Sequence, residues 1–372
     1  MPHTTPLVPD IRYVAPDFTA AQLVGAPPAR TVRAERDGVL PDDFFATTNL
    51  PTYVKGADGT WTMPREPRMD GALVRDAAGV WWVREGRRVR AGDEVVVGRS
   101  EDGSEGVLVH AHGFRPAVAA HGDFHFMASQ VSREKPIDYR RIARMLVEEK
   151  RRGGYVLWVT GPALVHSRAR DNLVWFIRNG YVQVLLAGNA VAVHDIEADI
   201  VGTTLGMTST GDATEGGHSA HMRAINSVRR SGSIARAVKD GTVRGGIMHA
   251  CVVEDVPFVL AGSLRDDGPL PDVITDMIVA QDATRAHTKR ATMAVLIATA
   301  LHSIAVGNML PAYYEDSERG IQELPTICVD ASEFLVSKLK DRGTHQAIGV
   351  VTNAQDFMSI LQAAVEREVA EG

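Results

Sequence analysis

Residues 256–273 read VPFVLAGSLRDDGPLPDV and join an apolar run to a sudden cluster of charge. The apolar run, Val256 to Ala261, is typical of a strand buried on both faces of a parallel sheet. Open α/β sheets bind ligands beyond the carboxyl ends of their strands, which is where Arg265, Asp266 and Asp267 stand. The stretch therefore predicts a functional loop with Asp266 and Asp267 as candidate catalytic carboxylates. A solvated, charged turn without a function is the alternative for the same residues.

Predicted strands and helices alternate on both sides of that stretch. Apolar runs that predict strands lie at 155–160, 182–187, 256–261, 325–330 and 347–352. Segments that predict helices lie at 138–151, 168–179, 221–240, 272–285, 289–305, 332–341 and 355–370. This alternation predicts an α/β fold in which helices cover both faces of a parallel sheet.

The first third of the chain has a different pattern. Short strand-like pieces (TYVKG, GALVR, VWWVRE, DEVVVGR and EGVLVHA) alternate with turn signals there. Such spacing predicts a small antiparallel β domain. We expect an irregular N-terminal arm over 1–36, a β-rich domain over 37–125 that contributes to the substrate site, and an α/β domain over 126–372.

Composition limits the classes of function. The chain has 372 residues, 45% of them hydrophobic, and a formal net charge of −6. Two domains with sizeable cores are expected, whereas no basic patch indicates a nucleic acid or a membrane surface as partner. The two cysteines are far apart in the sequence and no signal peptide is apparent, which together predict a cytoplasmic protein. The apolar segment 293–309 is short for a membrane span and carries polar residues, so it is predicted to be a buried helix.

The loops after the predicted strands are rich in glycine, asparagine and aspartate. Residues 161–163 (GPA) follow the first strand and lead into a helix-like segment, a setting that favours a phosphate. Residues 188–190 (GNA) follow the second strand, and Asp330 ends the fourth. An acid at such a strand end commonly binds ribose hydroxyls. No GxGxxG motif is present, so a nucleotide site is indicated only by the architecture and Asp330.

Three histidines, His218, His221 and His302, can each be interpreted as functional or as structural residues. His218 and His221 end the glycine-rich segment 210–221, and their spacing puts both imidazoles on one helical face. The segment lacks the partner spacing of a zinc site, so no metal site is predicted, and a loop over a ligand is the preferred interpretation. His302 lies in an apolar segment and is interpreted as a core histidine, with Gly307 and Asn308 as the cap of that helix.

Several long motifs lie between about residue 40 and the end of the chain. They are FFATTNLPTYV (44–54), GPALVH (161–166), LLAGNAVAVHDIE (185–197), GTTLG (202–206), GGHSAHMRAIN (216–226), LAGSLRDDGPLPDV (260–273), LHSIAVGNMLP (301–311), CVD (328–330) and DRGTHQAIGVVTN (341–353). In these motifs the chain resembles the NAD-dependent ornithine cyclodeaminases of archaea and cyanobacteria, a group also labelled the lysine-ketoglutarate reductase/saccharopine dehydrogenase (LOR/SDH) conserved-domain family. The resemblance implies a Rossmann-like, deoxyhypusine-synthase-like domain, bound NAD, a small amino-acid substrate and a homo-oligomer, either dimer or tetramer.

The resemblance also suggests roles for individual residues. Catalysis is expected to involve Asp266, Asp267 and His218. Substrate binding is expected from Arg265, Asn49, Thr48, Arg68 and Lys135. Cofactor binding is expected from Gly161, Pro162, Ala163, Gly188, Asn189, Ala190, Asn308, Asp330, Ser332 and Asn353. The chain departs from the family pattern before residue 40, at Asn353, where an aspartate is expected, and in a longer insertion at 313–324.

The implied reaction is redox-neutral. NAD takes a hydride from Cα of ornithine, the δ-amine closes the ring with loss of ammonia, and the hydride returns to give proline. Two alternatives stay open: the same chemistry on lysine or another diamino acid, with a keto acid as a possible end product, and an NAD-binding protein without turnover.

Overall fold

A computed structural model describes residues 11–116, 137–208, 212, 217–266, 268–341 and 347–371. The described residues form two compact units. The first contains residues 11–116 and 307–324, and the second contains 137–306, 325–341 and 347–371. The boundary expected between residues 125 and 126 lies outside the described residues and stays a prediction.

The second unit is built on a seven-stranded sheet in which every pairing is parallel. Its spatial order is β13-β12-β11-β10-β14-β17-β18. Without the edge strand β13, this is the order 3-2-1-4-5-6 of dinucleotide-binding folds, so the predicted Rossmann-like α/β class is confirmed. The strands are β10 (Val156–Thr160), β11 (Val184–Gly188), β12 (Phe258–Ala261), β13 (Val273–Ile274), β14 (Met293–Ile297), β17 (Thr326–Asp330) and β18 (Ala347–Val351).

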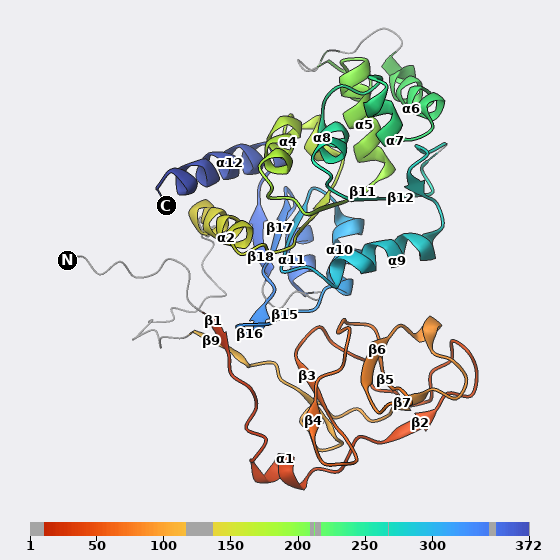
Figure 1. The fold of residues 1–372 in the computed structure, drawn as a ribbon, viewed down its shortest axis with the longest axis vertical. Coiled ribbons are helices and arrows are strands. Elements are labelled where there is room, and N and C mark those ends of the chain that lie inside the picture. Colours follow the sequence, from red (N-terminus) through yellow and green to blue (C-terminus); the bar gives the residue numbers. More distant parts are fainter. Residues whose placement is uncertain are drawn as a thin grey trace, which may run out of the picture. The chain divides into compact units, whose positions relative to one another are not determined.

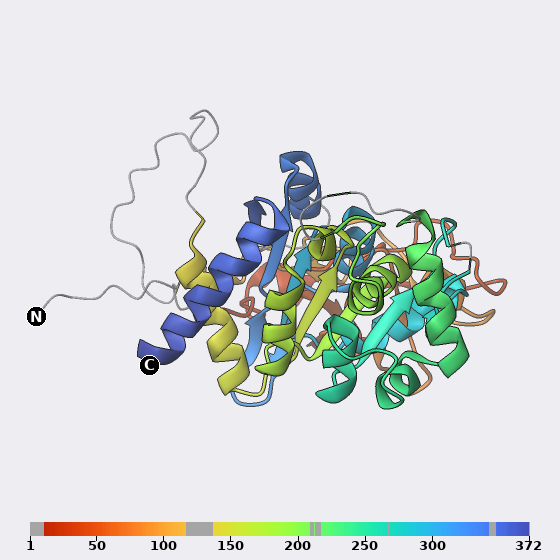
Figure 2. The ribbon, with the colours of Figure 1, turned by 90° about the horizontal axis from the view of Figure 1, so that it is seen from above.

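Helices lie on both sides of this sheet (Figures 1 and 2). In Figure 1, α4 and α8 lie on the opposite side from α9 and α10, and α12 packs against α2 and α4. The helices of this unit are α2 (Tyr139–Arg151), α3 (Ala163–His166), α4 (Arg170–Arg178), α5 (Asn189–Ile200), α6 (Ala220–Ser231), α7 (Ile234–Lys239), α8 (Ile247–Val253), α9 (Met277–Thr288), α10 (Ala300–Met309), α11 (Glu333–Asp341) and α12 (Ala354–Glu371), of which the end of α10 belongs to the first unit.

The core of the second unit explains why these strands read as continuous apolar runs. All five residues of β10 and all five of β14 are buried, because helices cover both faces of the sheet. Trp158 of β10 packs on Phe176 of α4 with ring centroids 5.2 Å apart, and both side chains are fully buried. Among the described helices, none has the length and apolar character needed to cross a bilayer.

Three helix predictions in this unit are wrong in their boundaries. The segment 289–305 is not one helix: it splits into strand β14 and helix α10, because residues 293–297 fill the centre of the sheet. The segment 221–240 breaks into α6 and α7 at Gly232, whose φ of 90° ends α6. The segment 272–285 begins with the edge strand β13, and α9 starts only at Met277, after the cap Asp276.

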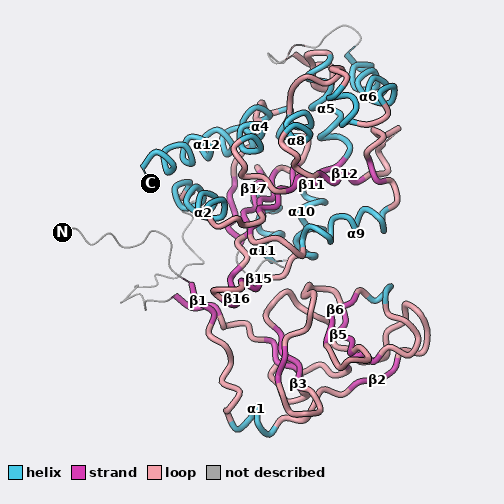
Figure 3. Tube along the Cα trace, in the orientation of Figure 1, coloured by secondary structure: helices cyan, strands magenta, loops and turns pink. Residues whose placement is uncertain are grey.

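The first unit consists of small antiparallel sheets joined by loops (Figure 3), as predicted. One sheet has the order β2-β7-β5-β6 and another β4-β3-β8. The arm predicted to be irregular contains β1, α1 and β2, and β2 pairs with β7, so that prediction is wrong for the described residues from 11 onward. The elements are β1 (Ile11–Tyr13), α1 (Ala21–Gly25), β2 (Thr31–Arg33), β3 (Thr52–Lys55), β4 (Trp61–Thr62), β5 (Ala72–Arg75), β6 (Trp81–Arg84), β7 (Glu94–Val96), β8 (Val107–Val109), β9 (Phe114–Pro116), β15 (Tyr313–Asp316) and β16 (Gly320–Glu323).

Candidate functional site

The turns after β10 and β14 meet at the carboxyl edge of the parallel sheet. The Gly161 amide donates to the Ile297 carbonyl at 2.9 Å. A Cβ on Gly161 would lie 1.7 Å from the Ala298 carbonyl oxygen, so only glycine permits this approach. Pro162 has no N–H, which leaves Ala163 as the residue of this turn whose amide can face a phosphate.

The residues after β11 and β12 are joined by one asparagine. Asn189 is buried at the start of α5, and its Nδ2 donates to Asp266 Oδ1 at 3.1 Å. Its Oδ1 accepts from the Leu270 amide at 3.1 Å, so its amide is used within the protein. The Ser263 amide donates to the other Asp266 oxygen at 2.7 Å. A carboxylate has about four lone-pair sites, so Asp266 is oriented by these two bonds and keeps acceptor capacity for a ligand.

His302 lies at this edge of the sheet and is a candidate that the sequence did not identify as functional. Its ring lies against Gly188 at the end of β11: a Cβ on that glycine would be 2.8 Å from His302 Cε1. Burial lowers the pKa of His302 below its usual value, and the negative charge of Asp266 opposes that shift. Gly307 and Asn308 lie within α10, which continues to Met309, so they do not cap it as predicted. The signal for His302 was present in the sequence only as a histidine inside an apolar segment.

The far side of the same edge carries Asp330, Ser332 and Asn353. Asp330 ends β17, and its Oδ1 accepts from the Ser332 amide at 2.9 Å. Asn353 precedes α12, and its side chain exchanges two hydrogen bonds with Asp356: Oδ1 accepts from the Asp356 amide, and Nδ2 donates to Asp356 Oδ2. Asparagine and aspartate cap helices equally well, which explains how Asn353 is accommodated where the resemblance led us to expect an aspartate.

Within the first unit, Asn49 is the predicted residue most suited to a ligand. It is 6% exposed, and its Nδ2 is buried without a hydrogen-bond partner among the described residues. A buried donor without a partner is costly, and a bound ligand is one way to satisfy it. Thr48 has a local use, because its Oγ1 accepts from the Leu50 amide at 3.2 Å.

Other predicted residues are already engaged or lie outside the description. Arg68 forms an ion pair with Glu85 at 2.7 Å and donates to the Met69 carbonyl, so its guanidinium is already used in the first unit. Asn308 donates to Asp70 Oδ2 at 3.2 Å, while its own Oδ1 is buried without a partner among the described residues. The Arg265 side chain is exposed. Lys135, Asp267 and the side chain of His218 lie outside the described residues.

A buried carboxylate, Glu197 on α5, holds the loop that follows that helix. It accepts hydrogen bonds from Thr203 Oγ1 and from the Leu205 and Gly206 amides at 2.9–3.2 Å. His194 Nδ1 lies 3.1 Å from the same carboxylate. Burial raises the pKa of Glu197, but the hydrogen bonds outweigh burial and hold this pKa below its usual value. The LLAGNAVAVHDIE segment therefore includes a carboxylate that organises the loop 203–206.

Replacing Glu197 with glutamine is expected to lower the free energy of unfolding by about 3 kcal/mol, because an amide cannot satisfy the four donors. The folded pKa lies below the unfolded value of 4.5, so the stabilisation is complete above pH 4.5 and is lost as the pH falls below it. Urea unfolding at several pH values measures both effects. The exposed Glu148→Gln is the matched control, and equal stability of the two variants would contradict the expectation.

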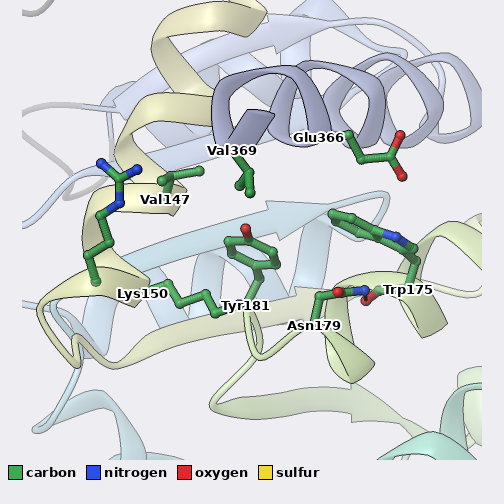
Figure 4. Close-up of a pocket in the computed structure, with 8 residues that line it drawn as sticks. Val147, Lys150, Trp175, Asn179, Tyr181, Glu366 and Val369 are labelled. Atoms are coloured by element: carbon green, nitrogen blue, oxygen red, sulfur yellow. Dashed lines mark hydrogen bonds between the residues drawn. The ribbon is translucent and has the colours of Figure 1, made fainter. Parts of the chain in front are cut away.

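A separate pocket of about 430 Å³ lies at the opposite edge of this unit (Figure 4). It lies between α12 and the ends of α2 and α4, just before strands β10 and β11 begin. Tyr181 and Trp175 stack at its base with ring centroids 5.7 Å apart. None of the predicted site residues lines it, so the candidate site is the carboxyl edge. The lining residues are Val147, Lys150, Arg151, Trp175, Asn179, Tyr181, Glu366 and Val369.

The strand order defines an α/β protein of the Rossmann type, and the carboxylate, amide and imidazole groups make its carboxyl edge the candidate ligand site. Comparison with known proteins gives the family. Residues 140–361 match the model of the arginine dihydrolase ArgZ-like C-terminal Rossmann fold, and residues 51–140 match the first region of the same C-terminal part. The chain belongs to this family, which confirms the resemblance drawn from the sequence.

Two curated relatives illustrate the family. The chain is 46% identical to an ornithine cyclodeaminase of Methanopyrus kandleri over 92% of its own length and 81% of the relative's. It is 38% identical to the bifunctional arginine dihydrolase/ornithine cyclodeaminase AgrE of Nostoc, over 89% of this chain and 46% of AgrE.

Solved structures agree with this assignment. A conserved putative LOR/SDH protein from Methanococcus maripaludis superposes with a TM-score of 0.82 at 38% identity, covering 92% of this chain and 99% of that one. The ternary complex of AgrE with ornithine and NAD⁺ superposes with a TM-score of 0.59 at 36% identity, covering 94% of this chain and 47% of AgrE.

Proposed function

We propose that the chain is an NAD-dependent ornithine cyclodeaminase that converts L-ornithine to L-proline and ammonia. The observation that carries the proposal is the 46% identity to a protein of that name over 92% of the chain. The AgrE complex, which contains both ornithine and NAD⁺, supports the choice of substrate and cofactor.

The residues at the carboxyl edge fit NAD. The strand order is that of dinucleotide-binding folds, and Asp330 supplies an acid at a strand end for a ribose. We place the pyrophosphate near residues 161–163, the adenosine ribose at Asp330 with Ser332 and Asn353 near it, and the nicotinamide towards residues 188–190. When bound, NAD supplies a hydride acceptor for Cα of the substrate and returns that hydride to the cyclic imine.

The chain's own groups account for substrate binding. The exposed Arg265 guanidinium is assigned to the substrate carboxylate, because a guanidinium binds a carboxylate through two parallel hydrogen bonds. Asp266, oriented by Asn189 and Ser263, is assigned to a substrate ammonium group. Within the first unit, Asn49 stays a proposed ligand-binding residue, because its buried amide nitrogen has no partner among the described residues.

Deuterium transfer tests the function directly. The purified chain, with its bound nucleotide identified, is incubated with L-ornithine deuterated at Cα and no added reductant. Proline that keeps deuterium at Cα, released with one equivalent of ammonia, is the expected result. That result would show that the cofactor that removes the hydride from Cα also returns it.

Other outcomes would identify the alternatives. Bound NAD without proline, but with turnover of lysine or another diamino acid, would replace ornithine as the substrate. Release of a keto acid would place the end of the reaction at imine hydrolysis. Bound NAD with no turnover of any amino acid would contradict an enzymatic role.

We also propose a homo-oligomer that works in the cytoplasm. Cys251 and Cys328 are buried and form no disulfide, which fits a reducing compartment. Met277, Ile278 and Val279 are exposed on the first turn of α9, where a second copy would cover them. Light scattering of the purified chain measures the assembly, and a monomer would contradict this proposal.

A further inference from the structure

The reaction proposed above requires a proton to move between two nitrogens of the substrate. The α-ammonium releases a proton to water before the hydride leaves Cα. The δ-nitrogen must then give up a proton for ring closure, and the α-nitrogen must gain one before the Cα–N bond breaks and ammonia leaves. One group that accepts the proton of the δ-nitrogen and donates one to the α-nitrogen balances the sequence, because its protonation state is restored after each turnover. Such a group works best when it is neutral at the start and its pKa lies close to the working pH.

His302 has the chemistry and the place for this transfer. Burial lowers the pKa of its imidazole, which favours the neutral form that accepts a proton. Its ring lies against Gly188, at the end of β11, on the edge where ligands of such sheets bind. A side chain at position 188 would occupy the place of the ring, since a Cβ there lies 2.8 Å from His302 Cε1.

Asp266 provides the counter-charge that a protonated His302 needs. The negative charge of its carboxylate favours the imidazolium form and raises the pKa of His302. Asn189 and the Ser263 amide fix the two carboxylate oxygens at 3.1 and 2.7 Å, so the carboxylate is oriented before substrate arrives. Asn189 follows Gly188 directly in the chain. Gly188 leaves room for the His302 imidazole, and Asn189 orients the Asp266 carboxylate, so two adjacent residues position both groups.

We propose that His302 is the acid–base residue of this site, taking the proton from the δ-ammonium and giving it to the departing α-nitrogen, while Asp266 stabilises its protonated form. The inference rests on the proposed function and extends it, because Asp266 then acts through the imidazole as well as on the substrate. Asn189 is a positioning residue in this arrangement.

The test compares the unmodified full-length chain with His302→Gln, using proline formation across pH and NAD binding measured separately. Neutral imidazole is the active form, so kcat of the unmodified chain should fall at acidic pH. The variant should lose about a hundredfold or more in kcat together with that acid limb, and keep its NAD affinity within about threefold. Added imidazole should restore part of the activity of His302→Ala, in proportion to the free-base concentration.

A second histidine of the same unit provides the matched control. His287 is also partly buried, with a pKa lowered mainly by burial, but it bonds to the Tyr155 hydroxyl before the start of β10, at the opposite edge. His287→Gln should retain kcat and the acid limb. The double variant His302→Gln/Asp266→Asn should lose at most about threefold more kcat than the more impaired of the two single variants. The reason is that groups acting as a pair give losses in kcat that do not multiply.

The outcomes separate this inference from the proposed function. Proline formation by the unmodified chain, with an unchanged kcat and acid limb in His302→Gln, would overturn the inference alone. Losses that multiply in the double variant would overturn the pairing with Asp266. No proline from the unmodified, NAD-bound chain would overturn the proposed function and this inference with it.

Discussion

Replacing Asp266 with asparagine is expected to lower kcat for proline formation by about a hundredfold or more, with NAD still bound. Two effects combine. The variant loses the negative charge that faces His302 and the substrate ammonium, and its amide nitrogen presents a donor to either Asn189 Nδ2 or the Ser263 amide. KM for ornithine should rise as well, because an ammonium ion loses its counter-charge.

Steady-state kinetics and NAD binding by calorimetry measure these effects. Glu148→Gln removes a carboxylate from the exposed face of α2 and serves as the control for charge alone. If Asp266→Asn retains full turnover with the cofactor bound, the assignment of Asp266 to the site is wrong.

Replacing Gly161 with alanine is expected to abolish measurable NAD binding and to lower the free energy of unfolding by about 1–3 kcal/mol. A Cβ at this position would lie 1.7 Å from the Ala298 carbonyl oxygen and 2.9 Å from Thr299 Cβ, so the turns after β10 and β14 must separate. These two strands are the adjacent pair at which the chain changes direction across the sheet, where dinucleotides bind in such folds.

Urea unfolding and titration with NAD measure the two consequences separately. Gly307→Ala is the matched control, because the added methyl group would meet no described atom within 4 Å beyond its own stretch of helix, and alanine is favoured within a helix. Gly161→Ala with unchanged NAD affinity would contradict the placement of the pyrophosphate near this turn.

Local sequence determined much of the fold. A parallel strand covered on both faces must be apolar at every position, so five strands of the second unit were predicted within about two residues of their bounds. The loops that follow those strands were predicted to carry the candidate site, because the carboxyl ends of parallel strands lie at one edge of a sheet. The family was also evident from sequence, because its motifs span most of the chain.

The tertiary structure decided what local pattern leaves ambiguous. Residues 293–297 and 300–309 form one apolar segment, and periodicity does not separate a central strand from a buried helix. Residues 293–297 form a strand because they lie between β10 and β17 in the sheet, which is a tertiary arrangement.

The grouping of side chains was likewise a tertiary result. Arg68 and Asp266 are both charged residues near turns, yet Arg68 is paired with Glu85, whereas Asp266 is held by Asn189 and its charge acts on His302. Residues 189, 266 and 302 are far apart in sequence, and they lie at one edge because strands β11, β12 and β14 all end there. Sequence therefore determined which segments form the sheet and its loops, and packing decided which of their side chains act together.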